Sequence, residues 1–402
     1  MDTIVLANAR LADGSSTDIL IESGRISRFG APAPESATTI DLGGRLVLPA
    51  LIDAHIHLDK TLLGLPWQPH RAENTTQGRI AAEKDLRRTL DWPVDKTGAE
   101  LLRLALSHGT TAVRSHVDID EVTGLRNVEA VLRLRERWSS FVDIELVAFP
   151  QSGIRRCPGA IELLDEAMKM GCDLIGGLDP VGIDDDLDGH LDAIFDLAHR
   201  HGTGLDIHLH DQGEPGLSEI LAIADRTKAD GLGGRVTVSH AFALGSVTPD
   251  RAAHAADRLA EAGVTILTSA PGAGPMPPVA LLRAAGVRVV AGSDNIRDAW
   301  SPFGNASMLE RCWLVAYRCG FRTDTDVERT FDLATSNAAS LLGLERGLAA
   351  GCSADLIALR ADTLARAIIE RPRPDLVLRR GRVTHWVDGL DPGRLPRLTL
   401  PR

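Results

Sequence analysis

The sequence lacks several features that would assign it to particular classes of protein. No apolar run approaches the roughly 18 residues that a membrane-spanning helix needs, so we expect no insertion into a bilayer. There are only five cysteines in 402 residues, and no two of them form a CxxC pair. We therefore expect neither a disulfide framework nor a thiolate zinc cluster, but buried or incidental thiols in a reducing compartment.

The sequence also lacks an excess of basic charge and a visible secretory signal. Basic residues number 44 against 55 acidic ones, which gives a formal net charge of −11. This balance argues against general binding to nucleic acid or to anionic membranes. The initial segment, MDTIVLANAR, has no basic stretch followed by an apolar one. We therefore expect a cytoplasmic protein.

The middle of the chain alternates between two patterns. Short apolar or β-branched runs recur, and segments with apolar residues at i, i+3 and i+4 lie between them, such as 160–170 and 187–199. Gly171 and Gly202 follow these two segments, as expected of helix ends. Eight strand–helix units predict an α/β fold, a (β/α)₈ TIM barrel. A doubly wound open sheet is the alternative, but no GxGxxG motif opens the first unit. The predicted strands are 50–57, 111–117, 144–149, 174–178, 204–210, 236–240, 264–268 and 287–294.

Both ends of the chain consist of short strand-like runs separated by turn residues. The runs are 4–6, 19–21 and 25–27 at one end, and 354–359, 376–378 and 382–384 at the other. We predict that residues 1–48 and 345–402 form one small β-sandwich domain. Residues 49–344 would then form the catalytic barrel.

Two histidines, His55 and His57, end the first predicted strand. Side chains two residues apart on a strand share a face, so both imidazoles point the same way and offer half of a metal site. Taken alone, the pair is also consistent with two hydrogen-bonded interior histidines.

Polar side chains recur where three further predicted strands end. His208 and His210 end the fifth, His240 the sixth and Asp294 the eighth. Reactive groups of a TIM barrel gather at the carboxyl ends of its strands, so these side chains are expected to meet near one axis. Burying them without partners would be costly, and a bound cation satisfies them. The pattern therefore predicts a metal site.

The order of these residues resembles that of the amidohydrolase superfamily. Longer segments narrow the resemblance to the branch that contains bacterial cytosine deaminases and N-isopropylammelide isopropylaminohydrolase. These segments are 46–49 with 53–60, 114–118, 148–153 and 292–300, and the similarity extends through nearly the whole chain. The runs 208–213 and 293–297 are nearer to the isopropylammelide enzyme, and Asn295 replaces a second aspartate of cytosine deaminases.

The resemblance implies one divalent metal ion, Zn²⁺ or Fe²⁺. Its ligands would be His55, His57, His208 and Asp294. Relatives with two metals commonly carry a carboxylated lysine at the end of the fourth strand. The corresponding segment here, 176–180, reads GGLDP, so a single ion is favoured.

The resemblance also implies roles for residues around the metal. His240 would lie beside the metal-bound water, and Gln151 would bind the ring edge of the substrate. Asp211 stands where cytosine deaminases carry a proton-shuttling glutamate. His210 has three alternatives: it replaces His208 as a ligand, transfers protons, or orients Asp211.

Two alternative roles are open for each of three more residues near these segments. Lys60 and Trp300 are expected at the pocket mouth, with a structural role as the alternative. His116, in the second strand, would support the metal ligands or be a satisfied core histidine.

The expected function is that of a metal-dependent deaminase or aminohydrolase. A metal-activated hydroxide would cleave an exocyclic C–N bond of a small heterocyclic amine, such as a cytosine-like pyrimidine or an aminotriazine. Alternatives are a ring-opening cyclic amide hydrolase and a catalytically silent scaffold. A nucleic-acid editing deaminase is disfavoured, because its PCxxC signature is missing. By analogy with relatives we expect a homo-oligomer.

Overall fold

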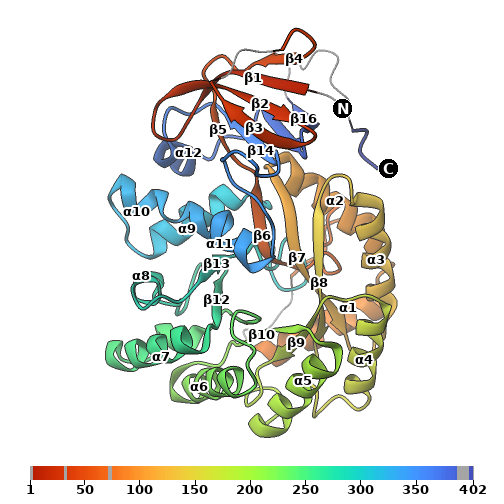
Figure 1. Ribbon diagram of the computed structural model, residues 1–402. Helices are drawn as coiled ribbons and strands as arrows, with labels where there is room; N and C mark the ends of the chain where they lie inside the picture. The colour runs from red at the N-terminus through yellow and green to blue at the C-terminus, as the bar shows by residue number, and fades with distance from the viewer. Residues whose placement is uncertain (1–2, 31–33, 71–74, 387–397, 402) are drawn as a thin grey trace.

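The computed structural model describes residues 3–30, 34–70, 75–386 and 398–401. The structure has two units that lie next to each other (Figure 1). One is a sheet built from both ends of the chain, and the other is a barrel surrounded by helices. In the described ranges, no helix combines the length and apolar character needed to cross a membrane.

The barrel is an eight-stranded parallel sheet in the order β13-β12-β11-β10-β9-β8-β7-β6. A parallel bridge between Ile56 and Asp294 brings its two edge strands together, with the Asp294 N–H donating to the His55 carbonyl at 2.7 Å. The TIM-barrel prediction is thereby confirmed. The strands are β6 (Leu51–Ile56), β7 (Thr110–Ile119), β8 (Asp143–Pro150), β9 (Leu174–Leu178), β10 (Gly204–His208), β11 (Val236–Ser239), β12 (Thr265–Thr268) and β13 (Val289–Ala291).

Each of the eight predicted runs overlaps one of these strands. The strands β7 and β8 extend beyond their predicted runs at both ends, and several others end earlier than expected. His57, His210, His240 and Asp294 all lie just beyond a strand. At His240 and Asp294 the backbone has a positive φ, 72° and 61°, so the chain turns away from the strand direction there. Alternation along a strand therefore does not set the direction of these two side chains.

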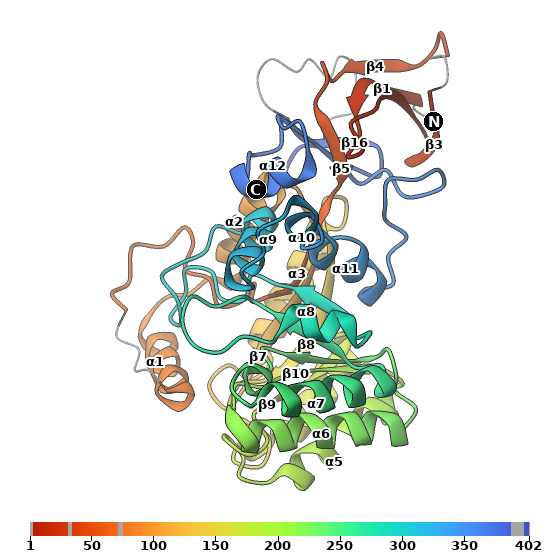
Figure 2. The same cartoon turned by 90° about the vertical axis from the view of Figure 1, so that its left-hand side faces the viewer.

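Helices surround the barrel, and Figure 2 shows α5, α6 and α7 side by side on its outer surface. The predicted helix 160–170 is confirmed, and the one predicted at 187–199 extends two residues further. Gly171 and Gly202 follow them with φ values of 118° and 66°, a left-handed geometry that glycine adopts without steric cost. The helices are α1 (Thr76–Thr89), α2 (Val94–Ser107), α3 (Arg126–Trp138), α4 (Ala160–Met170), α5 (Leu187–His201), α6 (Gly213–Ala229), α7 (Pro249–Ala262), α8 (Val279–Ala284), α9 (Met308–Arg318), α10 (Asp324–Glu328), α11 (Ser336–Leu341) and α12 (Leu364–Glu370), with 3₁₀ turns η1 (Phe242–Gly245) and η2 (Phe331–Ala334).

The second sheet contains strands from both ends of the chain, in the order β16-β15-β14-β5-β1-β2-β3, with β4 also paired to β1. It is mixed: β14 pairs antiparallel with β5, while β1 pairs parallel with β4 and β5. The prediction that both termini build one β-rich unit is confirmed. Its strands are β1 (Thr3–Arg10), β2 (Ser16–Glu22), β3 (Arg25–Phe29), β4 (Thr38–Asp41), β5 (Leu46–Pro49), β14 (Leu356–Leu359), β15 (Leu376–Arg379) and β16 (Arg382–Trp386).

The terminal sheet lies near the amino ends of β6, β7 and β8. The Ala50 N–H, just before β6, donates to the Asp355 carbonyl at 2.9 Å, and Arg379 at the end of β15 bonds Asp143 at the start of β8. The carboxyl ends of these strands therefore point away from the terminal sheet. They are the ends that carry the clustered histidines.

Candidate metal centre and surrounding site

The histidines and the aspartate expected to bind metal converge at the carboxyl ends of the barrel strands. His55 and His208 have ring centroids 4.6 Å apart, and His57 and His208 5.5 Å. Asp294 joins them from beyond β13: its Oδ1 lies 3.6 Å from His55 Nε2 and 3.4 Å from His57 Nε2. The four side chains therefore lie around one small volume.

His116 of β7 belongs to the same cluster. Its ring is 4.0 Å from that of His55 and 4.6 Å from that of His208, and it is fully buried. Possible ligand atoms of His55, His57, His116 and His208 all lie within 4.8 Å of one another. In the sequence, only the family resemblance of segment 114–118 drew attention to His116. A single histidine inside a strand has no second ligand at a recognisable spacing.

The donor atoms of the cluster fit a divalent cation. Within the described part of the chain, buried His55 Nε2, His57 Nδ1 and both ring nitrogens of His208 have no hydrogen-bond partner. Burial lowers the pKa of His55 and of His208 well below the usual value, and lowers the pKa of His57 to about 3. These imidazoles are neutral at neutral pH, the form that binds metal.

Asp294 complements the neutral imidazoles with a negative charge. Burial raises the pKa of its carboxyl, but the nearby rings of His240, His57 and His55 outweigh burial and hold that pKa well below the usual value. A cation at this place would therefore meet neutral nitrogens and a carboxylate, a donor set that suits Zn²⁺ or Fe²⁺.

A hydrogen-bonded chain fixes the orientation of the His55 ring. Ser239 Oγ donates to Asp206 Oδ1 at 2.7 Å, so at 3.0 Å it accepts from His55 Nδ1–H. Arg114 Nη1 holds the other carboxylate oxygen of Asp206 at 2.9 Å. The remaining nitrogen of His55, Nε2, carries a lone pair toward Asp294, as a ligand requires.

His210 and His240 stack beside the cluster. Their ring centroids are 4.6 Å apart, and Nδ1 of His240 is 3.9 Å from Asp294 Oδ2. Asp179, after β9, accepts from the backbone N–H of His210 at 2.5 Å and pairs with its Nδ1 at 2.8 Å. Burial works against the charged form of His210, but Asp179 outweighs burial and raises the pKa of the ring.

Asp211 faces a different part of the site. Its Oδ2 accepts from the backbone N–H of Gly182 at 2.7 Å, and its carboxyl hydrogen-bonds Glu219 of α6. Burial and the nearby charge of Asp179 raise the pKa of Asp211. The sequence did not mark Asp179 or Glu219 as candidates, because neither stands at a recognisable spacing from the histidines.

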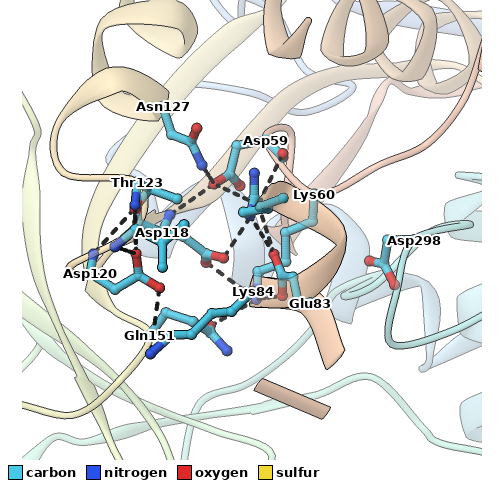
Figure 3. Close-up of polar contacts among 12 residues, drawn as sticks. Asp59, Lys60, Glu83, Lys84, Asp118, Asp120, Thr123, Asn127, Gln151 and Asp298 are labelled. Atoms are coloured by element: carbon cyan, nitrogen blue, oxygen red, sulfur yellow. Dashed lines mark hydrogen bonds and ion pairs between the residues drawn. The ribbon is translucent and has the colours of Figure 1, made fainter. Parts of the chain in front are cut away.

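Lys60, Gln151 and Trp300 come together near the histidines. Lys60 Nζ donates to Gln151 Oε1 at 2.8 Å and lies 4.9 Å from the centroid of the Trp300 ring. Burial is the largest cause of the low pKa of His57, and the positive charge of Lys60 is the next largest. Lys60 therefore lies close to the histidine cluster. Figure 3 shows Lys60 and Gln151 among several acidic side chains.

The five cysteines are all free. Cys157, Cys172 and Cys312 are buried, and Cys319 and Cys352 are half-buried. None of them belongs to the histidine cluster.

Comparisons with known proteins point in one direction. A model of the amidohydrolase family matches residues 38–389. N-isopropylammelide isopropyl amidohydrolase of Pseudomonas sp. (strain ADP) is 33% identical over 391 residues, which cover 94% of this chain and 96% of that protein.

Solved structures are similar over the same length. The crystal structure of N-isopropylammelide isopropylaminohydrolase from Burkholderia multivorans ATCC 17616 has a TM-score of 0.93 at 40% identity, covering 96% of this chain and 98% of that one. The crystal structure of 5-methylcytosine deaminase from Klebsiella pneumoniae, liganded with 5-fluorocytosine, has a TM-score of 0.85 at 27% identity, with the same coverage.

Proposed function

This chain belongs to the amidohydrolase family, and we propose that it is a metal-dependent aminohydrolase acting on small heterocyclic amines. It would cleave the bond between a ring carbon and an exocyclic amine, releasing ammonia or an alkylamine and leaving a ring carbonyl. The relatives named above include an aminohydrolase of an isopropylammelide and a deaminase of a methylcytosine, so aminotriazines and cytosine-like pyrimidines are the first substrates to consider.

The observation that carries the proposal is the convergence of neutral, unpartnered imidazoles with one carboxylate. We propose His55, His57, His208 and Asp294 as the ligands of one divalent ion, Zn²⁺ or Fe²⁺. A single ion is favoured because β9 ends at Leu178 and is followed by Asp179, with no lysine to bridge a second ion. His116 would pack against the ligands, since Asp206 lies 3.4 Å from its Nε2.

The ion would supply Lewis acidity that makes a water molecule nucleophilic near neutral pH. Asp294 is placed to accept the proton that this water loses, because its second oxygen faces His240 rather than His57. His240 would donate to the oxygen as charge develops on it, a fixed electrostatic contribution to the transition state.

We propose His210 as the group that delivers a proton to the substrate. Its ring stacks on His240, and Asp179 holds its Nδ1, so Nε2 is the ring nitrogen left for proton transfer. Asp211 remains a candidate for the same role, but its carboxyl is engaged by Gly182 and Glu219. Gln151, Lys60 and Trp300 would orient the heterocycle.

The test combines metal analysis with amine release. Wild-type protein reconstituted with Zn²⁺ or Fe²⁺ should bind about one ion per chain and release amine from at least one member of a panel of aminotriazines and aminopyrimidines. Asp294→Ala should abolish turnover even with metal in excess, because both a ligand and the proton acceptor are lost.

Three results would contradict the proposal. Near-normal turnover of Asp294→Ala would remove this residue from the mechanism. Ring-opened acids without amine release would identify a cyclic amide hydrolase. Protein that neither binds metal nor turns over any member of the panel would favour a catalytically silent scaffold.

We further propose that the enzyme acts in the cytoplasm as a homo-oligomer, as the sequence led us to expect. Size-exclusion chromatography with light scattering gives the mass of the assembly directly. A mass equal to the 43.1 kDa of one chain would overturn the second half of this proposal.

A further inference from the structure

Lys60 is buried within a group of mostly charged side chains, of which the mechanism above uses only Lys60 and Trp300. We call this group the Lys60 cluster and define it as Lys60, Glu83, Arg87, Asp118 and Trp300. Glu83 and Arg87 lie on α1, a helix in the connection between β6 and α2 that stands apart from the terminal sheet (Figure 2). The cluster therefore links a helix outside the barrel strands to a residue beside the metal centre.

The contacts inside the cluster converge on Glu83. Its Oε2 lies 3.4 Å from Lys60 Nζ and accepts the indole N–H of Trp300 at 2.6 Å. Its Oε1 accepts from Arg87 at 2.7 and 3.0 Å, one helical turn further on. Glu83 thus touches both residues that we place against the substrate, Lys60 and Trp300, although it lies on a separate element. Figure 3 shows Glu83 beside Lys60.

Glu83 also supplies the negative charge that a buried ammonium needs. Asp118 Oδ1 is 3.2 Å from Lys60 Nζ, but burial together with the charges of Glu83 and Asp59 raises the pKa of Asp118 well above its usual value. Asp118 therefore holds a negative charge less readily than Glu83 does. Glu83 remains as the carboxylate, because Lys60 and Arg87 outweigh burial and lower its pKa.

Lys60 in turn fixes which end of the Gln151 amide faces the substrate. An ammonium group can only donate, so the atom of Gln151 that it contacts at 2.8 Å has to be the oxygen, Oε1. The amide nitrogen, Nε2, is then directed elsewhere. It is buried and has no hydrogen-bond partner in the described ranges of the chain, so it remains as a donor.

We propose that Glu83 is a positioning residue that acts through Lys60 on Gln151, and that this arrangement selects heterocycles presenting a hydrogen-bond acceptor to Gln151. The acceptor is a ring carbonyl oxygen or an unprotonated ring nitrogen. A ring with an N–H or C–H at that place leaves the buried amide donor unsatisfied and binds more weakly. This inference rests on the proposed function, which it deepens by naming an edge of the substrate.

The first experiment compares Glu83→Gln with the wild type. The substitution keeps the shape of the side chain and an acceptor for Trp300, but removes the charge that holds Lys60. We expect KM to rise at least about tenfold with kcat changed by less than about threefold, because orientation of the substrate is lost while the metal ligands stay in place. Asp85→Asn, which removes an exposed carboxylate from the same helix, should leave both constants unchanged.

A double-variant cycle tests whether Glu83 acts through Lys60. If it does, Glu83→Gln added to Lys60→Met has little further effect on KM, so the two effects do not multiply. Multiplicative effects would overturn the proposal. So would a fall in kcat with KM unchanged.

Substrate selectivity gives the second part of the test. Two panel substrates are compared that differ only in having a carbonyl oxygen or a hydrogen at one ring position. The wild type should favour the carbonyl compound at least about tenfold in kcat/KM, and Glu83→Gln should reduce this preference. Equal preference in both proteins would overturn the selection of an acceptor edge.

A spectroscopic measurement keeps this test separate from the proposed function. The indole N–H of Trp300 donates to the Glu83 carboxylate, so its proton resonance should lie downfield and should move upfield in Glu83→Gln but not in Asp85→Asn. Trp300→Phe assigns the signal. If the wild type turns over no panel substrate, the proposed function fails. If the signal does not move, the contact between Glu83 and Trp300 fails instead.

Discussion

At the scale of single residues, hydrogen bonding separates side chains that the sequence cannot distinguish. His208 is the last residue of β10, and His210 lies two residues beyond it. His208 is fully surrounded by other rings and has no hydrogen-bond partner in the described part of the chain, while His210 is held by Asp179. This contrast supports the proposal that His208 binds the metal and that His210 transfers protons.

The same contrast yields a prediction about proton transfer. His210→Asn should lower kcat by roughly 10²–10⁴-fold with metal content retained, because Asn fills the site without carrying a proton. Asp211→Asn should lower kcat less, since Asp211 bonds Gly182 rather than the histidine pair. Steady-state kinetics with metal analysis of both variants checks this. A larger loss in Asp211→Asn would return the proton role to that carboxyl.

Residues with an obvious pattern were predictable, and residues without one were not. The two pairs, His55 with His57 and His208 with His210, show spacings of two that mark one face of a strand. Glu83 and Asp179 carry no such mark, because each acts through a partner far away in the chain. Lys60 and Gln151 were expected near the substrate, but their mutual hydrogen bond, 91 positions apart, was not.

At the scale of elements, the closure of the barrel depends on a close approach between two strands. Gly292 follows β13 where the chain passes His55 in β6. A methyl group at Gly292 would lie 2.8 Å from the backbone nitrogen and oxygen of His55, which is closer than van der Waals contact allows. Only glycine lets the two segments approach so that Asp294 reaches the histidines.

Gly292→Ala should therefore disturb the metal centre more than the fold. We expect a loss of roughly 1–3 kcal/mol in the free energy of unfolding, together with a marked fall in metal affinity, because His55 and Asp294 move apart. Metal titration and urea unfolding measure the two effects. Gly272→Ala is the matched control, since a methyl group there meets no atom within 4 Å. Unchanged metal affinity in Gly292→Ala would show that the strands can separate without affecting the ligands.

Helices were predictable where their caps and apolar spacing agree. The segment 160–170 has both, and the helix found there ends at a left-handed glycine. The function of α1 was not predictable in this way. Its position against Lys60 depends on tertiary contacts, such as that of Glu83 with Lys60 and that of Arg87 with Asp118.

At the scale of the whole molecule, arginines join the terminal sheet to the barrel. Arg379 at the end of β15 bonds Asp143 and lies 2.8 Å from Asp355. Arg346 reaches Asp143 at 2.9 Å and Thr111 of β7 at 2.7 Å. Arg379 is nearly inaccessible to solvent, so these carboxylates compensate its charge in place of water.

Asp143→Asn should weaken the contact between the terminal sheet and the barrel without changing the catalytic reaction. We expect the free energy of unfolding to fall by about 2 kcal/mol, because Arg379 and Arg346 lose a charged acceptor in a buried place. Metal content and KM should stay the same, since Asp143 lies at the amino end of β8. Glu345→Gln, which removes an exposed ion pair with Arg25, should cost less than about 1 kcal/mol. Equal losses in both variants, measured by urea unfolding, would contradict the role of the buried pair.

The sequence by itself determined the barrel, the β-rich unit built from the two termini and the types of residue that gather at the candidate metal centre, because each depends on a local pattern. Apolar runs of strand length alternate with helical spacing, and histidines recur where those runs end. The tertiary structure decided which of these side chains meet, how His116 joins them, and how Glu83 reaches Lys60 from a helix outside the barrel strands. Such contacts join residues distant in the chain, and their geometry depends on backbone turns such as those at His240 and Asp294, which no local pattern specifies.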